Sequence, residues 1–286
     1  MPSLIDIRRR IRSVKNTQQI TKAMKMVSAA KLRRAQDRVV SARPYGAMLR
    51  KMLGNVAAAV AADEQAGSNA LLAQRPEQRV LLVLVTSDKG LAGAFNTNLI
   101  KAAQRFVTEH ASASIRMVLI GRKGRDFFRK RGATVVSEHL HMAQKLVFAD
   151  VAAIAGKAME MYRNDEIDAV YLIYNEFKSV VAQTLTTARV LPMELPEQAA
   201  PVDYIFEQPP VEILAALLPR YVETEFYRAL AESTAAEHAA RMTAMEAATS
   251  NAGDMIEKLT LYMNRVRQAS ITKEIIEVVS GAAAAE

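Results

Sequence analysis

The 286-residue sequence contains no cysteine, which excludes a disulfide framework, a thiolate metal site and a thiol nucleophile. No apolar run reaches the ~18 residues that a membrane-spanning helix needs. The first residues, from Met1 to Asp6, contain no apolar core of a signal peptide and lead directly into a charged helical pattern. These absences fit a reducing compartment, and we expect any association with a membrane to be indirect, through other proteins.

The stretch from Arg220 to Gly281 contains no proline and only one internal glycine, Gly253. Residues with a high helix propensity fill it. Apolar residues recur at spacings of three and four, at Ile256, Leu259, Met263, Val266, Ile271, Ile275 and Val278. A single helix over this stretch would be about 90 Å long, since each residue adds roughly 1.5 Å. A helix of that length needs a partner helix, or a cavity in another protein, along most of its course.

A second long helix is predicted over residues 3–60, with Ser3 as its N-cap and Asp6 in its first turn. Its apolar positions are Leu4, Ile7, Ile11 and Val14, and then Ile20, Met24 and Val27. Pro44 is expected to kink or interrupt this helix. The two long helices are predicted to pair in antiparallel orientation, as a coiled coil.

Positive charge is concentrated at the start of the chain. Residues 1–51 carry fourteen Lys and Arg against two Asp, a net +12, whereas residues 211–286 sum to −4. Three interpretations are open: a solvated helix face with some ion pairs to the partner helix, a nucleic-acid-binding surface, or a surface that meets an acidic protein. No aromatic residue precedes Tyr45, so stacking on bases has no support.

The middle of the chain alternates between strand and helix patterns, which predicts a Rossmann-like α/β domain with a mostly parallel sheet. The predicted strands are 80–85, 117–120, 134–136, 170–174 and one within 180–190, and the predicted helices are 96–110, 124–131 and 148–162. The predicted division is 1–62 for an N-terminal coiled-coil helix, 76–192 for the α/β domain, 193–210 for a linker and foot, and 211–286 for a C-terminal coiled-coil helix. The fold class is therefore α/β with long helical arms.

No catalytic, cofactor-binding or metal-binding residue is expected. The strand-to-helix turn from Thr86 to Asn96 has neither the G-x-G-x-x-G nor the Walker A pattern. His139 and His141 would share one face of a strand, but Glu138 would point the other way, so a metal would lack further ligands. The acids Asp165 to Asp168 are interpreted as a solvated loop.

Several motifs together resemble the gamma subunit of F-type ATP synthases. The C-terminal signature runs from Ile271 to Ala283, with Ile-Thr-x-Glu, an acid three residues later, and Gly-Ala four after that. The N-terminal segment from Ile11 to Val27, the turn Ser87-Asp88-Lys89-Gly90-Leu91-Ala92-Gly93, and the segments Ile120-Gly121-Arg122-Lys123-Gly124 and Tyr174-Asn175-Glu176-Phe177 resemble the same family. The resemblance covers nearly the whole chain.

This resemblance implies a rotor of a proton-translocating ATP synthase, which couples rotation of a membrane ring to ATP synthesis. Implied partners are the alpha and beta subunits of a surrounding hexamer, the epsilon subunit and the membrane c-ring, with no nucleic acid. The implied location is peripheral, on the cytoplasmic face of a bacterial inner membrane. Implied contacts with the beta subunit are Lys22, Met24, Lys25, Arg241, Gln268, Thr272 and Glu274, and implied contacts with the ring are Tyr204 and Glu207. The alternatives are a basic coiled-coil nucleic-acid-binding protein and a free-standing α/β enzyme with helical arms.

Overall fold

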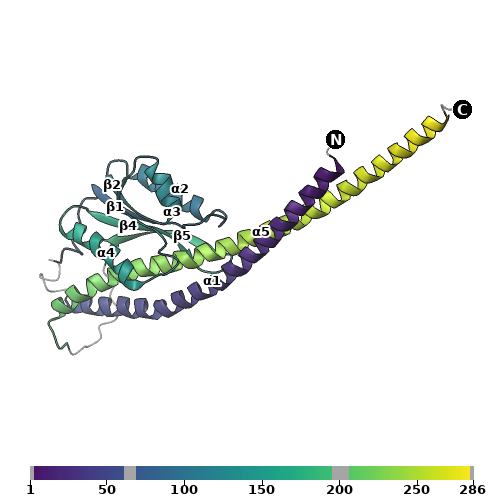
Figure 1. Cartoon of the computed structure of the whole chain (residues 1–286). Coiled ribbons are helices and arrows are strands. Elements are labelled where there is room, and N and C mark those ends of the chain that lie inside the picture. Colours follow the sequence, from purple (N-terminus) through teal and green to yellow (C-terminus); the bar gives the residue numbers. More distant parts are fainter. Residues whose placement is uncertain (1–2, 61–68, 195–205, 284–286) are drawn as a thin grey trace. The chain divides into compact units, whose positions relative to one another are not determined.

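The computed structural model of the chain describes residues 3–60, 69–194 and 206–283, which fall into two compact units. Unit 1 comprises Met1–Ser28 and Met242–Glu286, and unit 2 comprises Ala29–Arg241. Two long helices, α1 (Leu4–Ala59) and α5 (Pro210–Ala283), contribute to both units (Figure 1). Within each unit they contact one another with opposite chain directions, which confirms the predicted antiparallel pair.

Unit 2 contains a five-stranded sheet. The strands are β1 (Arg79–Val85), β2 (Ser114–Ile120), β3 (Thr134–His139), β4 (Ala169–Phe177) and β5 (Gln183–Leu191). Their spatial order is β3-β2-β1-β4-β5, and every neighbouring pair is parallel except β4 with β5. The predicted Rossmann-like domain with a mostly parallel sheet is confirmed.

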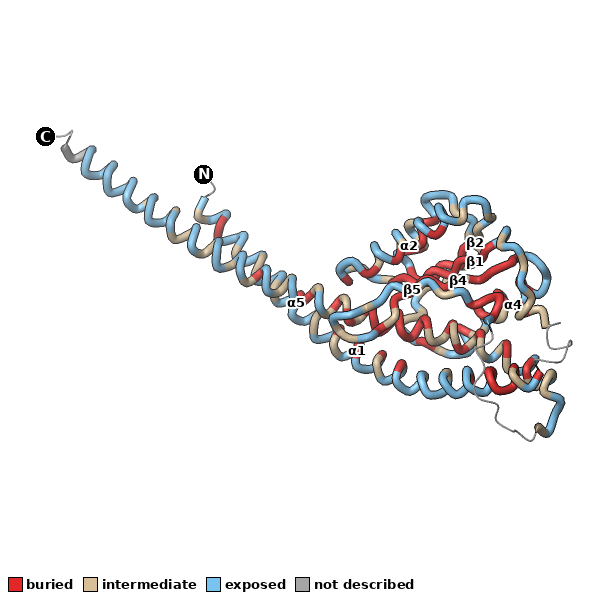
Figure 2. The backbone as a smooth tube through the Cα atoms, turned by 180° about the vertical axis from the view of Figure 1, so that it is seen from behind, coloured by how far each residue is buried: buried red, intermediate tan, exposed pale blue. Residues whose placement is uncertain are grey.

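Three helices cover the sheet: α2 (Phe95–Glu109), α3 (Arg122–Arg129) and α4 (Phe148–Arg163). Helices α2 and α3 lie on one face and α4 lies on the other (Figure 1). Helix α2 buries Phe95, Leu99, Ala103 and Phe106, a spacing that places all four on one side of a helix. Strand β1 is buried on both faces, as its unbroken apolar sequence predicts, and it forms the centre of the core (Figure 2).

Helix α1 begins with the predicted cap. The Ser3 hydroxyl accepts a hydrogen bond from the Asp6 backbone N–H at 3.2 Å and donates one to the Asp6 carboxylate at 2.8 Å. The prediction that Pro44 interrupts the helix is wrong, because α1 runs through it without a break. Pro44 and Val40, four residues earlier, are both exposed, so water can hydrogen-bond the carbonyl that the proline leaves without an N–H partner.

The inward face of α1 in unit 1 differs from the predicted apolar seam. Ile20 and Val27 are 60% and 56% exposed, whereas Thr21 and Ser28 are buried. Both hydroxyls have partners: Ser28 donates to the Met24 carbonyl within α1 at 2.8 Å, and the Thr21 hydroxyl lies 2.8 Å from the Thr249 hydroxyl of α5. A small hydroxyl side chain lets the two helices approach closely, and its hydrogen bond leaves no buried polar group unpaired. A search for apolar spacing in the sequence does not detect such buried positions.

Asp168 is buried, which corrects the prediction of a solvated acidic loop. Its carboxylate accepts backbone N–H groups of Gln78 and Arg79 at 3.2 and 2.8 Å, and an Arg79 guanidinium N–H at 2.6 Å. The side-chain hydrogen bond from Arg79 is the largest cause of a lowered pKa for Asp168. The residue therefore holds the start of β1 against the start of β4.

We expect Asp168→Asn to lower the free energy of unfolding by about 2 kcal/mol at neutral pH, because charge-assisted hydrogen bonds are lost. The folded-state pKa lies below the unfolded one, so the carboxylate stabilises the fold above the unfolded pKa and this stabilisation is lost as pH falls through the folded pKa. Urea titrations of both forms at neutral and acid pH measure this. Asp165→Asn is the control, since Asp165 also pairs with an arginine but is 68% exposed. Equal losses in the two variants would contradict the assignment.

Candidate functional site

The carboxyl ends of the strands are where open α/β sheets bind ligands, at the point where the strand order reverses. Here that point lies between β1 and β4, and α5 lies across this edge. Leu230, Ser233 and Thr234 of α5 face Val85 of β1 and Ile120 of β2 around a space of only about 10 Å³. The chain's own helix therefore covers the carboxyl ends of β1 and β2, next to this reversal point.

Glu232 of α5 binds the carboxyl end of β4. Its carboxylate accepts the Phe177 backbone N–H at 3.1 Å and the Arg43 guanidinium N–H at 3.1 Å. Arg43 also donates to the Phe177 carbonyl at 3.2 Å. Glu232 is 2% exposed, so one buried carboxylate joins α5, α1 and the end of β4. Its hydrogen bonds satisfy the charge that burial would otherwise penalise.

The turn after β1 uses its polar side chains to hold its own backbone. The buried Ser87 hydroxyl donates to the Lys89 carbonyl at 2.6 Å, and the Asn96 amide oxygen accepts the Ser87 N–H at 3.0 Å. Asp88 accepts the backbone N–H groups of Arg122 and His141 at 3.2 and 3.0 Å. Ser87 and Asp88 of the turn thus fix the backbone of this turn and of the neighbouring loops. This structural role does not require a bound phosphate.

Arg241 joins α5 to this turn. Its guanidinium donates to the Lys89 carbonyl at 3.1 Å and the Gly90 carbonyl at 3.3 Å, and it pairs with Glu237 at 2.7 Å. Both charged residues are buried, at 8% and 6% exposure. Burial raises the pKa of Glu237, while Arg241 opposes that rise. The family resemblance implied Arg241 only as a contact with the beta subunit. The structure shows that Arg241 also holds α5 against the turn after β1.

Three predicted contact residues lie together on α1 in unit 1. Lys22 is exposed, and Met24 and Lys25 are half-buried. Lys25 forms an ion pair with Glu246 of α5. Nearby, Gln18 donates an amide hydrogen bond to the Thr249 carbonyl at 3.4 Å. The helix pair thus presents an exposed cation and a partly exposed methionine next to an ion pair between the two helices.

The other predicted contacts lie near the end of α5. Gln268, Thr272 and Glu274 are exposed, and the Thr272 hydroxyl donates to the Gln268 carbonyl at 2.9 Å. Among and beyond them, apolar side chains are 48–71% exposed, at Ile271, Ile275, Ile276, Val278 and Val279. In unit 1 this end of α5 continues past the start of α1 (Figures 1 and 2). Such an apolar helix end is typical of a segment that another surface covers.

Glu207 is exposed just before α5, and Tyr204 lies outside the described residues.

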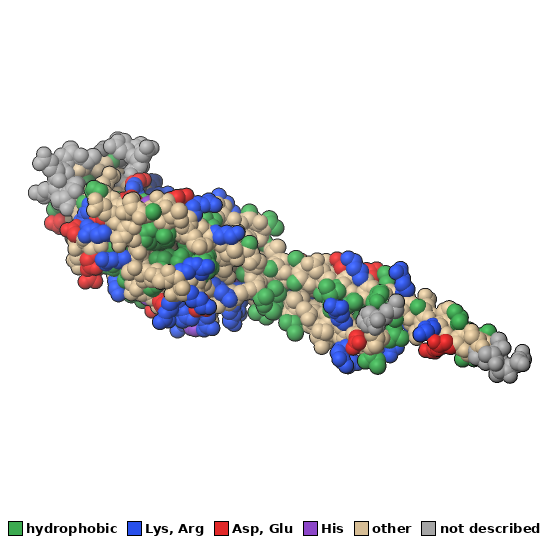
Figure 3. All heavy atoms as spheres, turned by 90° about the horizontal axis from the view of Figure 1, so that it is seen from above, with side chains coloured by type: hydrophobic (Ala, Val, Ile, Leu, Met, Phe, Trp, Pro, Cys, Tyr) green, Lys and Arg blue, Asp and Glu red, His purple; other side chains and the backbone are tan. Residues whose placement is uncertain are grey.

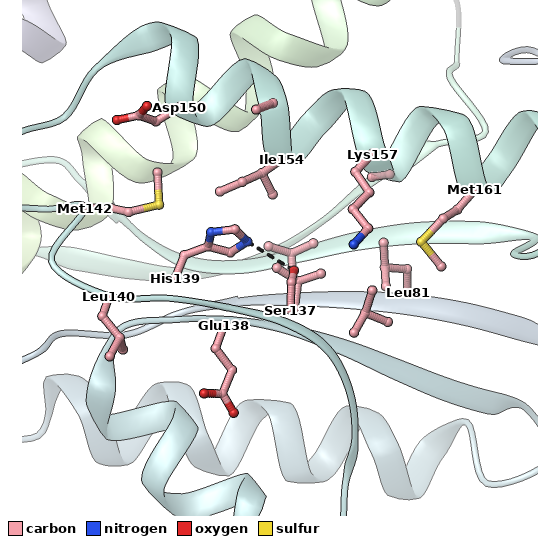
Figure 4. Close-up of a pocket in the computed structure, with 15 residues that line it drawn as sticks. Leu81, Ser137, Glu138, His139, Leu140, Met142, Asp150, Ile154, Lys157 and Met161 are labelled. Carbon is pink, nitrogen blue, oxygen red and sulfur yellow. Dashed lines mark hydrogen bonds between the residues drawn. The ribbon is translucent and has the colours of Figure 1, made fainter.

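The expectation that His139 and His141 share a strand face is wrong, because β3 ends at His139. Figure 4 shows His139 and Glu138 pointing to opposite sides of the strand, with the dashed line marking a 3.1 Å contact between His139 Nε2 and the Ser137 hydroxyl. Burial, and then the charge of Lys157, lower the pKa of His139. In the part of the chain that the structure describes, no group of three His, Cys, Asp or Glu could hold a metal ion.

Within residues 3–60, 69–194 and 206–283, no helix combines the length and apolar character that crossing a bilayer requires. The fold and these surfaces define a class of protein: a long antiparallel helix pair joined to an α/β domain whose ligand edge is closed by its own helix. Comparison with known proteins specifies that class. A family described as ATP synthase matches residues 3–285.

The chain is 75% identical to the ATP synthase gamma chain of Solibacter usitatus and 50% identical to that of an Anaeromyxobacter strain, covering 99% or more of each chain. It is also similar to a chain of the Tetrahymena thermophila mitochondrial ATP synthase, central stalk and c-ring, with a TM-score of 0.62 and 27% identity over 80% of this chain and 99% of that one. A Euglena gracilis chain, at 19% identity and a TM-score of 0.67 over 98% and 94%, shares the fold. The chain belongs to the ATP synthase gamma chain family, and it is a central-stalk rotor component of an F-type ATP synthase.

Proposed function

We propose that the two helices of unit 1 turn inside a hexamer of alternating alpha and beta subunits. The observation that supports this most strongly is the exposed apolar end of α5, from Ile271 to Val279. Exposure of such an apolar surface to water is unfavourable, and burial of that surface against surrounding subunits would be favourable. The related Tetrahymena chain is described as part of a central stalk with a c-ring, which fits the same arrangement.

The charge of α1 supports an acidic neighbour. Of the fourteen basic residues in positions 1–51, only Lys25 and Arg43 form an ion pair with an acid among the described residues. An internal role therefore accounts for little of the charge, and acidic loops of the beta subunit are the proposed counterpart of the cations of α1 that lie in unit 1. The proposed beta-subunit contacts are Lys22, Met24, Lys25, Arg241, Gln268, Thr272 and Glu274. Arg241 differs from the rest, since its guanidinium already has partners within unit 2.

Tyr204 and Glu207 are the proposed contacts with the membrane c-ring, and the epsilon subunit is the proposed remaining partner. This arrangement would hold the chain at the cytoplasmic face of a bacterial inner membrane as a peripheral subunit. Because it turns, each orientation presents a different surface to each catalytic subunit. Each orientation then shifts the conformational equilibrium of those subunits by its difference in contact energy.

Co-purification tests the assembly. A tagged chain expressed in its native membrane is expected to bring down alpha and beta subunits in stoichiometric amounts together with ATPase activity. Recovery of nucleic acid without these subunits would favour the basic coiled-coil alternative. An ATPase activity that persists after the alpha and beta subunits are removed would favour the free-standing enzyme.

Met24→Lys is expected to reduce ATP-driven proton pumping while leaving ATP hydrolysis largely intact. The new cation would stand beside Lys22 and Lys25, and Lys25 already neutralises Glu246. An acidic beta-subunit loop would then gain about 1 kcal/mol of attraction at some rotor angles and not at others. Both activities are measured in membrane vesicles, with Met24→Leu as the uncharged control. Equal loss of the two activities, or no loss of either, would speak against a coupling contact here.

A cysteine placed at Glu207 is expected to cross-link to the ring subunit in membranes. The chain has no cysteine of its own, so the introduced thiol is unique. Lys101→Cys on the exposed side of α2 is the control, and it is expected not to cross-link. A cross-link at Lys101→Cys with none at Glu207→Cys would show that another surface of unit 2 meets the ring.

A further inference from the structure

A cavity of about 350 Å³ lies in unit 2 between α1, the turn after β1 and α5. It adjoins the small space under α5, with which it shares Asp88, Thr234 and Glu237, and it extends from there towards α1 and Arg241. Basic groups from all three elements line it. They are Lys31, Arg34 and Arg38 of α1, Lys89 of the turn, and Arg241 and His238 of α5.

The charges around this cavity do not balance. Its two acids, Asp88 and Glu237, are already engaged, Asp88 with two backbone N–H groups and Glu237 with Arg241 at 2.7 Å. The other four cations, Lys31, Arg34, Arg38 and Lys89, form no ion pair with any acid in the described parts of the chain. The cavity therefore has an uncompensated positive charge. The face of unit 2 that Figure 3 shows carries Lys and Arg side chains of its own along one margin, separately from this cavity.

His238 responds to this charge. Burial, then the positive charges of Arg241 and Lys31, lower its pKa to about 4, so the imidazole is neutral at physiological pH. Its Nδ1 lies 3.4 Å from an Arg241 guanidinium nitrogen, which can only donate. Burial is the larger cause of this lowered pKa, and a bound anion would offset only the part that comes from Arg241 and Lys31.

The spacing of the cations indicates the shape of the anion. Lys31, Arg34 and Arg38 follow one another at intervals of three and four on α1, so they form a row about 10 Å long. A row of that length suits several linked phosphates better than a single ion, and guanidinium groups bind phosphate oxygens in a fork. No Phe or Tyr is among the described residues that line the cavity, and its aromatic ring, His238, lies against the Arg241 guanidinium, so support for stacking on a nucleobase is weak.

We propose that this cavity binds a short chain of linked phosphates, of the tripolyphosphate class, held by Lys31, Arg34 and Arg38 with Lys89 opposite. Arg241 is not expected to bind it directly, because its donors already serve two carbonyls and Glu237. Such a chain occurs both as inorganic polyphosphate and as the triphosphate of a nucleotide. The bound anion would link α1 to the turn that α5 also holds.

Calorimetry on the purified full chain with sodium tripolyphosphate, at low and constant ionic strength, tests the proposal. Saturable binding at one site is expected, and Lys31→Gln and Arg34→Gln are each expected to weaken it about tenfold, the loss of one charge-assisted contact. Arg34→Lys keeps the positive charge but loses the two-pronged guanidinium geometry. Its affinity for tripolyphosphate should therefore lie between those of the unchanged chain and Arg34→Gln. The matched control is Lys101→Gln with Arg105→Gln, two exposed cations of α2 that line no part of this cavity.

ATP is expected to bind no more tightly than tripolyphosphate, because the cavity has no Phe or Tyr to stack on its base and the His238 ring already contacts Arg241. Tighter binding of ATP would overturn the assignment to inorganic phosphates in favour of a nucleotide. A short single-stranded DNA that binds more tightly than tripolyphosphate would overturn it in favour of nucleic acid. An absence of saturable binding, or equal weakening by the α2 control, would show that the basic row is only a solvated surface. Each of these results is independent of whether the chain assembles with alpha and beta subunits.

Discussion

Arg241→Ala is expected to lower the free energy of unfolding by about 3 kcal/mol, because it leaves a buried carboxylate without its cation. Glu237 is 6% exposed and pairs with Arg241 at 2.7 Å. The Lys89 and Gly90 carbonyls would lose their donor in the same variant. Urea denaturation of the full chain at neutral pH measures the loss.

The double variant Arg241→Ala with Glu237→Gln is expected to recover part of that loss, since a neutral amide tolerates burial better than an unpaired carboxylate. The pH dependence has a definite sign. Burial already raises the pKa of Glu237, and removing Arg241 takes away the stronger of the two cations, Arg241 and Lys31, that oppose the rise. The single variant should therefore be least destabilised at acid pH and lose stability as pH rises from about 4.3, the ordinary glutamate value, through the raised folded-state pKa. A double variant that is less stable than the single one at neutral pH would contradict the buried ion pair.

Gly121→Ala is expected to cost about 4 kcal/mol or more, an exceptional loss for one methyl group. Gly121 follows β2 with a φ of +92°, and a Cβ there would lie 2.1 Å from the Thr86 carbonyl oxygen. Thr86 cannot move away easily, because its N–H and its hydroxyl both donate to the Ile120 carbonyl, at 2.8 and 3.0 Å. The clash would separate the carboxyl ends of β1 and β2, where α5 is seated.

Gly132→Ala is the matched control. Its φ of +69° is also left-handed, but a Cβ there meets no atom within 4 Å. Only the backbone strain remains, which is about 1–2 kcal/mol. Thermal unfolding of the two variants separates the clash from the strain. Similar losses at both positions would mean that the contact with Thr86 relaxes at little cost.

The elements were predictable where one physical requirement dominates. An apolar run such as Val80–Val85 predicts a strand buried on both faces, and the structure places it at the centre of the sheet. The long helices were predictable from composition and spacing, and their antiparallel contact follows from their length and opposite charge. The domain boundaries at 62, 76, 192 and 211 stay predictions.

The failures at Asp168 and Thr21 share a cause: the deciding interaction came from a distant part of the chain. Asp168 looked solvated beside Asp165, and only its position against Arg79 shows why it is buried. Thr21 replaces an apolar residue on the inner face of α1 because Thr249 lies opposite. Pro44 is tolerated because its side of the helix faces water. The closure of the ligand edge by α5 depends on tertiary packing, which local sequence patterns do not encode.

The predicted contacts with other subunits came from a resemblance, and the structure adds where their side chains lie. Lys22 and Gln268 are exposed on the helices of unit 1, while Arg241 is buried in unit 2. An exposed side chain is available to a partner, whereas Arg241 would need to share its donors with Lys89 and Gly90. Met24→Lys is therefore expected to reduce the coupling of ATP hydrolysis to proton pumping. Arg241→Ala is expected instead to reduce the stability of the fold.

The proposed function requires that this chain turns inside a hexamer of alpha and beta subunits while they hydrolyse ATP. The absence of cysteine allows one probe to be attached at Lys101→Cys, an exposed position on α2. With the hexamer immobilised through its alpha and beta subunits, single-molecule observation of the probe after ATP is added tests the claim directly. We expect rotation in one direction that depends on ATP and stops when ATP is removed. A probe that keeps a fixed orientation while the same complexes hydrolyse ATP would contradict it.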